Sequence, residues 1–273
     1  MDIASRQLAT HGPISGLHPG DVPHGIQNQM RHHEATEIAR VWVNGDAVVA
    51  FAVMWPQWQS FHFGADPDLG DEHYLRVVEE VLDLATENGR VETEVSPGDR
   101  RFAETVGALG LVKTSEPFIL TSQDLDATKP IEVEGYTIRG AKMEEVDSIR
   151  AAHVSAFGSS WTTETYRRYM EAPPYEPANE IVAVAPDGEI AGFAVVWFDQ
   201  RNRIGYFEPV GTHSDHQRRG IGSAVLNGGM NWMLENGMAR ATVMHDADSP
   251  NNAAFYRSCG FMPIGSIERW VRE

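Results

Sequence analysis

The chain has 273 residues, of which 42% are hydrophobic and 22% are charged, which is the composition of a globular protein long enough for two domains. Its formal net charge is −17, from 22 basic and 39 acidic side chains. This charge would repel nucleic acid and anionic membranes and attract cations, and the alternative interpretation is that it serves solubility alone and indicates no partner. The single cysteine excludes an intrachain disulfide, and the lack of a signal peptide and of an apolar run of about 18 to 20 residues favours a cytoplasmic protein.

The first half of the chain has a weak pattern of predicted elements. In chain order it shows an apolar strand that ends in FAVMW (51–55), a helix that ends at ENG (87–89), and a helix–strand junction at VGALGLV (106–112). The histidines that precede these elements form no known zinc pattern, so we expect no metal site: His11, His18, His24, His32 and His33.

A polar, proline-containing segment, residues 121–135, indicates a linker, so we expect domains at 1–125 and 126–273. The second half has a clearer order of elements: a strand (136–142), two helices (143–157 and 161–170), a hairpin about a PDG turn (180–198), a strand (204–213), a helix ending at Gly237, a strand (239–246), a short helix (251–260) and a last strand (261–271). Strands alternate with helices after the hairpin, which predicts an α/β fold with a mixed sheet.

The first half repeats this order in a weakened form. FAVMW resembles FAVVW (193–197), ENG recurs at 235–237, and VGALGLV resembles YRSCGFM (256–262). One such similarity would be chance, but three in the same order indicate a tandem duplication.

The stretch VGTHSDHQRRGIGSAVL (210–226) places two arginines beside two glycines, between a predicted strand and a predicted helix. A helix N-terminus offers unpaired N–H groups and the positive end of the helix dipole, and glycines at 220 and 222 allow a close approach to a ligand. With Arg218 and Arg219, this turn suits a pyrophosphate. The spacing fits neither a P-loop nor a dinucleotide fingerprint, and a solvated basic loop with capping glycines is the alternative.

Two motifs resemble the GNAT superfamily of acyl-CoA-dependent N-acyltransferases. QRRGIG (217–222) matches the Q/R-x-x-G-x-G/A pyrophosphate loop of that family, and AFYRSCGF (254–261) resembles its last helix–strand junction. The resemblance covers residues 136–271 in element order and the first half more weakly. It implies two tandem GNAT-like domains, each a mixed, mostly antiparallel twisted sheet flanked by helices, with acyl-CoA as co-substrate.

The resemblance also implies cofactor-binding residues. The family's strand bulges before the loop and leaves backbone groups for pantetheine, which here points to the segment Pro209–His213 with Val210, Gly211 and Thr212. The pyrophosphate would lie on the turn and the first residues of its helix: Gln217, Arg218, Arg219, Gly220, Ile221, Gly222 and Ser223. The chain departs from the family where an asparagine is frequent, because Ser249 stands there, and Asn251 is assigned to the cofactor in its place.

Two residues match or suit catalytic roles. Tyr256 matches the family's general acid, which protonates the departing thiolate, and its alternative role is that of a core aromatic. Glu208, two residues before Val210, is the candidate base, directly or through water, and its alternative role is to bind the substrate ammonium. Weaker candidates lie at strand ends, and the cysteine is expected to pack: His213, His245, Asp246 and Cys259.

The first half lacks the features of the turn. Aligned on ENG, its counterpart of QRRGIG is LGDEHY (69–74), which carries two carboxylates in place of two guanidinium groups. The counterpart of Tyr256 is Val106, which has no proton to donate. We therefore expect the first domain to bind no acyl-CoA and to be non-catalytic.

The function predicted from the resemblance is an acyl-CoA-dependent N-acyltransferase, most simply an acetyltransferase, with direct transfer to a small primary amine. The acidic chain favours a cationic acceptor, such as an aminoglycoside-like compound or a polyamine. Two repeats also resemble mycothiol synthase, whose acceptor is a thiol-bearing glycoside amine. A non-catalytic acyl-CoA sensor is the alternative from another class, and either function fits a monomer or a homodimer. No Gly-x-Ser-x-Gly motif supports a hydrolase.

Overall fold

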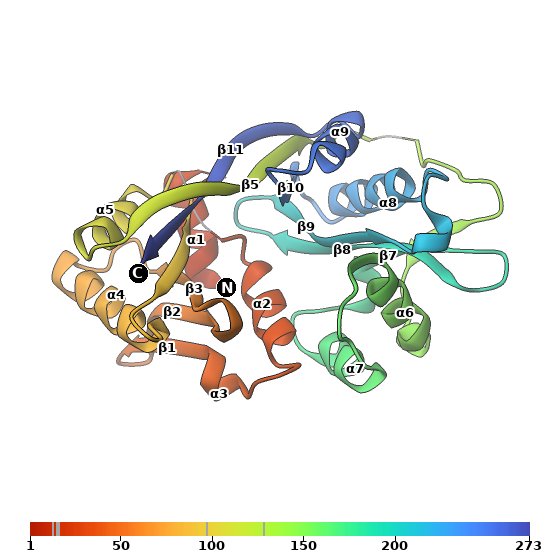
Figure 1. The fold of residues 1–273 in the computed structure, drawn as a ribbon. Coiled ribbons are helices and arrows are strands. Elements are labelled where there is room, and N and C mark those ends of the chain that lie inside the picture. The colour runs from red at the N-terminus through yellow and green to blue at the C-terminus, as the bar shows by residue number, and fades with distance from the viewer. Residues whose placement is uncertain (13, 15–16, 97, 128) are drawn as a thin grey trace. The chain divides into compact units, whose positions relative to one another are not determined.

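The structure, a computed structural model, describes residues 1–12, 14, 17–96, 98–127 and 129–273 (Figure 1). The chain forms two compact units, each of which contains segments from more than one part of the sequence. Unit 1 comprises Met1–Thr121, Met244–Ala254 and Met262–Glu273, and unit 2 comprises Ser122–Val243 and Phe255–Phe261. Both units are α/β with a mixed sheet, which confirms the fold class expected from the sequence.

Unit 1 has the strand order β1-β2-β3-β4-β11-β5, in which β1 to β3 are antiparallel and β3 is parallel to β4. Its strands are β1 (Ala39–Asn44), β2 (Ala47–Trp55), β3 (Ser60–Ala65), β4 (Val91–Val95), β5 (Val112–Asp124, of which 122–124 lie in unit 2) and β11 (Met262–Arg272). Its helices are α1 (Asp2–His11), α2 (Asp21–Gln29), α3 (Ala35–Ile38), α4 (Asp71–Ala85) and α5 (Arg100–Ala108), with a 3-10 turn at Pro56–Trp58.

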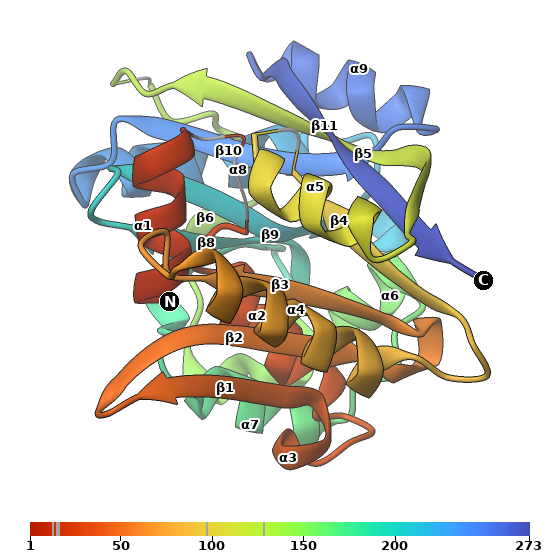
Figure 2. The same ribbon diagram turned by 90° about the vertical axis from the view of Figure 1, so that its left-hand side faces the viewer.

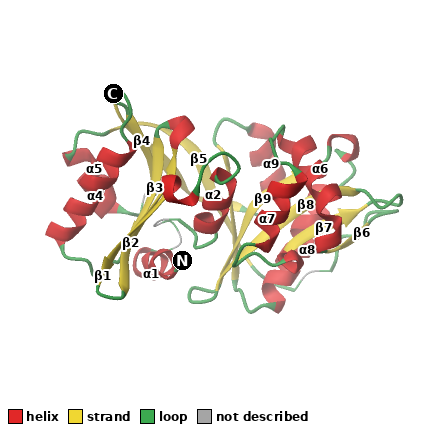
Figure 3. Ribbon diagram, turned by 90° about the horizontal axis from the view of Figure 1, so that it is seen from below, coloured by secondary structure: helices red, strands yellow, loops and turns green. Residues whose placement is uncertain are grey.

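The helices of unit 1 cover both faces of β1 to β3 (Figures 2 and 3). On one face, α4 and α5 pack on alternate residues of β2. The side chains that α4 buries there are apolar and recur at helical spacing: Tyr74, Val77, Val78, Val81 and Leu82. On the other face, α1 and α2 pack on Phe51 and Val53. The sheet of unit 1 is therefore sandwiched between two helical layers.

The last strand of the chain, β11, belongs to unit 1. It pairs antiparallel with β4, from Glu268 opposite Val95 to Arg272 opposite Val91, and Ile267 and Val271 are buried there. The domain boundary expected from the sequence, between residues 125 and 126, places β11 in the second domain. The contacts of β11 in the structure place it in unit 1.

Unit 2 has the strand order β10-β9-β8-β7-β6, in which β9 and β10 are parallel and the others are antiparallel. Its strands are β6 (Thr137–Gly140), β7 (Glu180–Val184), β8 (Ile190–Asp199), β9 (Ile204–Thr212) and β10 (Arg240–Asp246). Its helices are α6 (Val146–Phe157), α7 (Thr163–Glu171), α8 (Ile221–Glu235) and α9 (Pro250–Ser258), with 3-10 turns at Met143–Glu145, Pro177–Asn179 and Ser214–His216. The end of β10 and the start of α9, which lie within residues 244–254, belong to unit 1 by their contacts.

In unit 2, α8 lies along one face of β7, β8 and β9, and α6 and α7 lie on the other (Figure 1). The face under α8 is formed by small and branched side chains such as Ala194 and Val196, which pack on Val225 and Met233 of the helix. The helix ends at Glu235, and Gly237 has a φ of 84°, as the predicted C′ position requires.

No helix in the described part of the chain is both long enough and apolar enough to cross a membrane.

The placement of β11 leads to a prediction for Val271, which is 6% exposed. Val271→Asp would place a carboxylate at a buried position of unit 1, so the free energy of unfolding should fall by about 3 kcal/mol. Hydrogen exchange should accelerate at residues 91–95, which pair with this strand, and not at 204–207 in β9. Met262→Asp, at an exposed position of the same strand, is the matched control and should change neither measurement. Acceleration confined to unit 2 would contradict the pairing.

Candidate functional site

The cationic turn lies where the sequence predicts it, between the end of β9 and the start of α8. Gly220 is the N-cap of α8 and has a φ of 84°, and Arg218 has a φ of 62°, so the turn uses two residues of left-handed conformation. No side chain caps the helix, and residues 217–220 are exposed. The first N–H groups of α8 are therefore open to a ligand, at the positive end of the helix dipole.

The two arginines of the turn differ in their surroundings. Arg219 donates a hydrogen bond to the hydroxyl oxygen of Tyr136 at 3.1 Å, and this hydroxyl also lies 2.8 Å from Nδ1 of His216. Arg218 has neither a hydrogen bond nor an ion pair with any described residue. In a chain with a net charge of −17, an exposed guanidinium group without a carboxylate partner is an available site for an anion.

The strand that leads into the turn has a different partner on each edge. Its pairing with β10 ends at Phe207, opposite Val243, whereas its pairing with β8 continues to Thr212, opposite Gly192. Val210, Gly211 and Thr212 are half-buried, so the structure brings them to the loose end of β9, directly before the turn. The peptide groups on the β10 side of this end have no ladder partner in β10 and can bind a ligand.

Glycines allow the start of α8 to pack closely against β8 and against Phe255 of α9. A Cβ at Gly192 would lie 2.5 Å from Ile221, and one at Gly222 would lie 3.0 Å from the ring of Phe255 and 3.7 Å from Oγ1 of Thr212. The second glycine of the turn is thus required for packing as well as for the approach of a ligand.

Tyr256 lies on α9 and is 8% exposed. Its ring packs against Phe255 and Phe261, with centroids 5.1 and 6.1 Å away. Burial raises the pKa of the phenol, and the charges of Glu208 and Cys259 raise it further. The phenol therefore keeps its proton at neutral pH, which is the state that a general acid needs.

Glu208 is half-buried on β9, immediately before Pro209. Its main-chain carbonyl accepts a hydrogen bond from the indole N–H of Trp197 at 2.7 Å. Its carboxylate is close enough to Tyr256 and Tyr169 to raise the pKa of both phenols, although burial is the larger cause in each. The structure therefore brings the predicted base and the predicted acid into one electrostatic environment.

The other sequence candidates lie in different surroundings. Asn251 is exposed in the first turn of α9, where Ser249 accepts a hydrogen bond from the N–H of Asn252 at 3.4 Å. His213 accepts a hydrogen bond from the N–H of Asp215, and His245 lies 2.9 Å from the carbonyl of Asp246. These histidines serve local turns. Cys259 is half-buried, with its sulfur 3.6 Å from Oγ of Ser223, which agrees with a packing role.

A buried cluster that the sequence analysis missed lies on the face of the unit 2 sheet that α6 and α7 cover. Glu180, at the start of β7, is fully buried, and its carboxylate receives hydrogen bonds from the hydroxyl groups of Tyr166 and Tyr175 and contacts Nε2 of His153 at 2.9 Å. The ring of His153 stacks on Phe193 with centroids 3.6 Å apart. The tyrosine-rich sequence WTTETYRRYMEAPPY (161–175) was the available signal, but a charge at the start of an apolar strand is usually solvated.

The corresponding turn of unit 1 has the opposite charge. The first turn of α4 carries Asp71 and Glu72, and Asp71 forms an ion pair with Arg101 at 2.7 Å. The guanidinium group of Arg101 also lies 3.9 Å from the centroid of Tyr74. Val106, which replaces the phenol, is fully buried. The helix dipole of α4 is therefore already neutralised by its own carboxylates.

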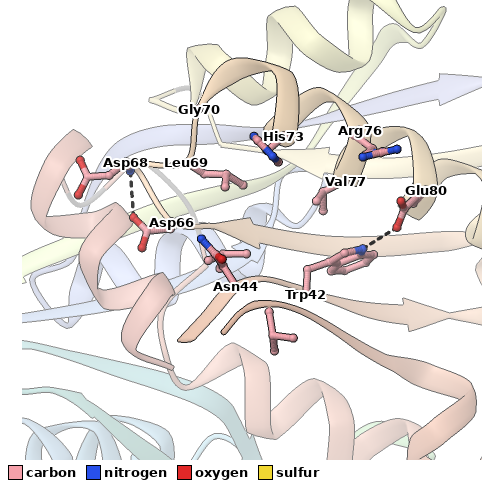
Figure 4. A pocket seen from close by; sticks show the side chains of 12 residues that line it. Trp42, Asn44, Asp66, Asp68, Leu69, Gly70, His73, Arg76, Val77 and Glu80 are labelled. Carbon is pink, nitrogen blue, oxygen red and sulfur yellow. Dashed lines mark hydrogen bonds between the residues drawn. The ribbon is translucent and has the colours of Figure 1, made fainter. Parts of the chain in front are cut away.

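A cavity of about 610 Å³ lies in unit 1, between β1, the loop after β3 and one side of α4 (Figure 4). Trp42 and Glu80 border it and are joined by a hydrogen bond of 2.7 Å. In unit 2 the corresponding side of α8 is covered, because β6 pairs with β7 and places Ile138 against Gly228. In the described chain no strand continues the sheet beyond β1, which leaves the cavity open. None of the predicted site residues lines it.

Among the residues that the structure describes, no three His, Cys, Asp or Glu side chains form a group that could hold a metal ion. The side chain of His11, one of the early histidines, lies outside this part.

In a comparison with known families, residues 146–261 match the family described as "Acetyltransferase (GNAT) family". The matched segment runs from the start of α6 to the end of the α9–β11 junction, so it contains the cationic turn, Glu208 and Tyr256.

Curated relatives are similar over part of their length. A mycothiol acetyltransferase of Streptomyces griseus is 27% identical over 173 residues, which are 61% of this chain and 55% of the relative. A mycothiol acetyltransferase of Streptomyces coelicolor is 27% identical over 170 residues, which are 60% of this chain and 54% of the relative. The chain thus spans about half the length of the curated relatives it matches.

Solved structures share the fold over nearly the whole chain. A tandem GNAT protein from the clavulanic acid biosynthesis pathway superposes with a TM-score of 0.61 at 14% identity, covering 92% of this chain and 93% of its own. At these identities the likeness shows the fold alone, and it confirms the tandem arrangement expected from the sequence repeat.

The buried phenols lead to a prediction about alkaline pH. Burial raises the pKa of Tyr166, Tyr169, Tyr175 and Tyr256 above the usual value of about 10. Above that pH the unfolded chain loses protons that the folded chain retains, so stability should be full below about pH 10 and should fall as the pH rises further. Urea unfolding at a series of pH values measures the slope, which should be smaller in Tyr169→Phe. Constant stability between about pH 9 and pH 11 would contradict the burial.

Proposed function

We propose that the chain transfers an acyl group, most simply acetyl, from acyl-CoA directly to a small primary amine, because residues 146–261 match the GNAT family of acetyltransferases. The observation that carries this proposal is the juxtaposition of three features at the end of β9: a strand edge without its ladder partner, a helix N-terminus without a side-chain cap, and a guanidinium group without a carboxylate.

These features suit different parts of coenzyme A. The diphosphate fits residues 217–223, where N–H groups of α8 and the charges of Arg218 and Arg219 converge. The amide groups of the pantetheine arm fit the free edge of β9 at Val210–Thr212, which can pair with them as a strand would. The assignment of Asn251 to the cofactor stays a prediction from the sequence.

The two candidate catalytic groups hold protons at opposite ends of the transfer. The carboxylate of Glu208 takes a proton from the acceptor ammonium, because only the neutral amine has a lone pair for attack on the thioester carbon. As the new C–N bond forms and the C–S bond breaks, the phenol of Tyr256 gives its proton to the thiolate, and the proton lost by the attacking nitrogen restores the phenol, directly or through solvent. The pKa of Tyr256 is raised by burial, so the phenol is protonated at neutral pH before the transfer.

The acceptor is the least specified part of the proposal. The acidic chain favours a cationic amine, such as an aminoglycoside-like compound or a polyamine. A thiol-bearing glycoside amine is a second candidate, because the matched curated relatives are mycothiol acetyltransferases. Release of free thiol from acetyl-CoA, measured against a library that includes all three classes, identifies the acceptor. No release with any amine would favour an acyl-CoA sensor.

We assign a supporting and non-catalytic role to the first domain. The carboxylates at the start of α4 and the valine in place of the phenol give it neither an anion site nor an acid. One coenzyme A per chain is therefore expected.

The diphosphate site is tested by Arg218→Ala and Arg219→Ala. Each change removes a charged donor, so the dissociation constant of coenzyme A in calorimetry should rise by about tenfold, with a larger effect for the pair. Arg76→Ala, an exposed arginine on α4 of unit 1, is the matched control and should leave binding unchanged at one molecule per chain. Unchanged affinity in the double variant, or two molecules per chain, would contradict the site.

The acid role is tested by Tyr256→Phe, which removes one hydroxyl and retains the packing of the ring. Turnover should fall by about a hundredfold, while the dissociation constant of coenzyme A stays within about twofold. Phe255→Leu, which alters the neighbouring ring without removing a proton donor, separates packing from chemistry. Full turnover in Tyr256→Phe would remove the phenol from the mechanism.

A further inference from the structure

The strand that carries Glu208 has an irregular register beside β8. Ala194 pairs with Val210, and Val196 pairs with Phe207, so two residues of β9, Glu208 and Pro209, lie opposite the single residue between them. Residues in such a bulge are left out of the ladder, and their main-chain groups need other partners. Pro209 has no N–H to donate, so that residue cannot contribute a ladder hydrogen bond at the bulge.

The indole of Trp197 supplies one such partner. Its Nε1–H donates to the carbonyl oxygen of Glu208 at 2.7 Å, across the two strands and one residue beyond the register shift. Trp197 is 5% exposed, so the donor side of this hydrogen bond is largely shielded from water. The bond therefore fixes the orientation of the Glu208 peptide group, on which the direction of the carboxylate depends.

The indole is itself held by the buried carboxylate cluster. The ring of Tyr175 packs edge-on against Trp197, with centroids 6.4 Å apart, and its hydroxyl donates to the carboxylate of Glu180. That carboxylate also accepts from Tyr166 at 2.9 Å and is fully buried. A chain of contacts thus leads from Glu180 through Tyr175 and Trp197 to the main chain of Glu208.

We infer that Trp197 is a positioning residue for the acyl transfer: its indole N–H fixes the Glu208 peptide in the bulge and so directs the Glu208 carboxylate toward the reacting amine. This inference rests on the proposed function, in which Glu208 is the base. A displacement of a reacting group by about 1 Å can cost about a hundredfold in rate, so loss of the bond should affect the chemical step more than binding.

The sharpest test removes the N–H and retains the ring. Replacement of Trp197 by β-(3-benzothienyl)alanine keeps the bicyclic shape without a donor, and Trp197→Phe is the variant with standard residues. The value of kcat for the amine should fall by about tenfold to a hundredfold, with the KM of acetyl-CoA within about twofold. The acidic limb of the pH profile of kcat should also move, because the surroundings of the base change.

A second measurement separates positioning from general damage. In the Glu208→Gln background the Trp197 replacement should cause no further loss of turnover, because the group that it positions is no longer a base. Trp232→Phe is the matched control: its indole donates to Oδ1 of Asn179 at 2.9 Å in the same unit, and its loss should leave kcat and the pH profile unchanged.

The outcomes distinguish the positioning role of Trp197 from the proposed role of Glu208 as the base. If Glu208→Gln is impaired but the benzothienyl variant keeps full turnover, or if the two losses multiply fully, the positioning role is wrong and the proposed base stands. If Glu208→Gln keeps full turnover, the base assignment is wrong and the inference is wrong with it.

Discussion

Backbone pairing between β9 and β10 ends at Phe207, and the proposed chemistry of unit 2 depends on this interruption. A strand whose edge loses its neighbour must satisfy its N–H and C=O groups in another way. On the β8 side the bulge at Glu208 and Pro209 is held by an indole, and on the β10 side the edge is open to a ligand. The uncapped helix N-terminus follows within ten residues, so both kinds of unpaired backbone group lie at one end of the sheet.

On the face of the unit 2 sheet that α6 and α7 cover, several polar side chains gather around the buried carboxyl group of Glu180. Glu180 is fully removed from water, and an isolated carboxylate there would be strongly unfavourable. Hydroxyl donors from Tyr166 and Tyr175 and the ring of His153 surround it. The hydroxyl of Tyr166 lies within hydrogen-bonding distance of both oxygens of Glu180 and of Nε2 of His153, so these side chains form one connected network. The aromatic residues of α7 and the following loop are therefore more than a hydrophobic layer, and the ring of Tyr175 also packs against Trp197.

The two units show how one scaffold supports opposite electrostatics. The element order β1-β2-β3-α4-β4-α5 in unit 1 repeats β7-β8-β9-α8-β10-α9 in unit 2, and both long helices begin after a glycine. Yet α4 begins with two carboxylates, one of them paired with Arg101, whereas α8 follows two arginines. The absence of a counterpart of β6 in the described part of unit 1 also opens a cavity along α4. Backbone geometry was kept, while surface charge and edge strands diverged.

The sequence by itself determined the features that depend on neighbouring residues: the order of strands and helices in the second half, the tandem repeat, the glycine-hinged turn at 217–222 and the helix end at Gly237. Periodicity, capping and turn chemistry act over a few residues, so they can be predicted from the chain alone. Only the tertiary structure decided that β11 completes unit 1, that Glu180 is buried and that Trp197 binds the carbonyl of Glu208. These depend on which distant segments become neighbours in space, and a glutamate at the start of an apolar strand reads the same in sequence whether water or three aromatic side chains surround it.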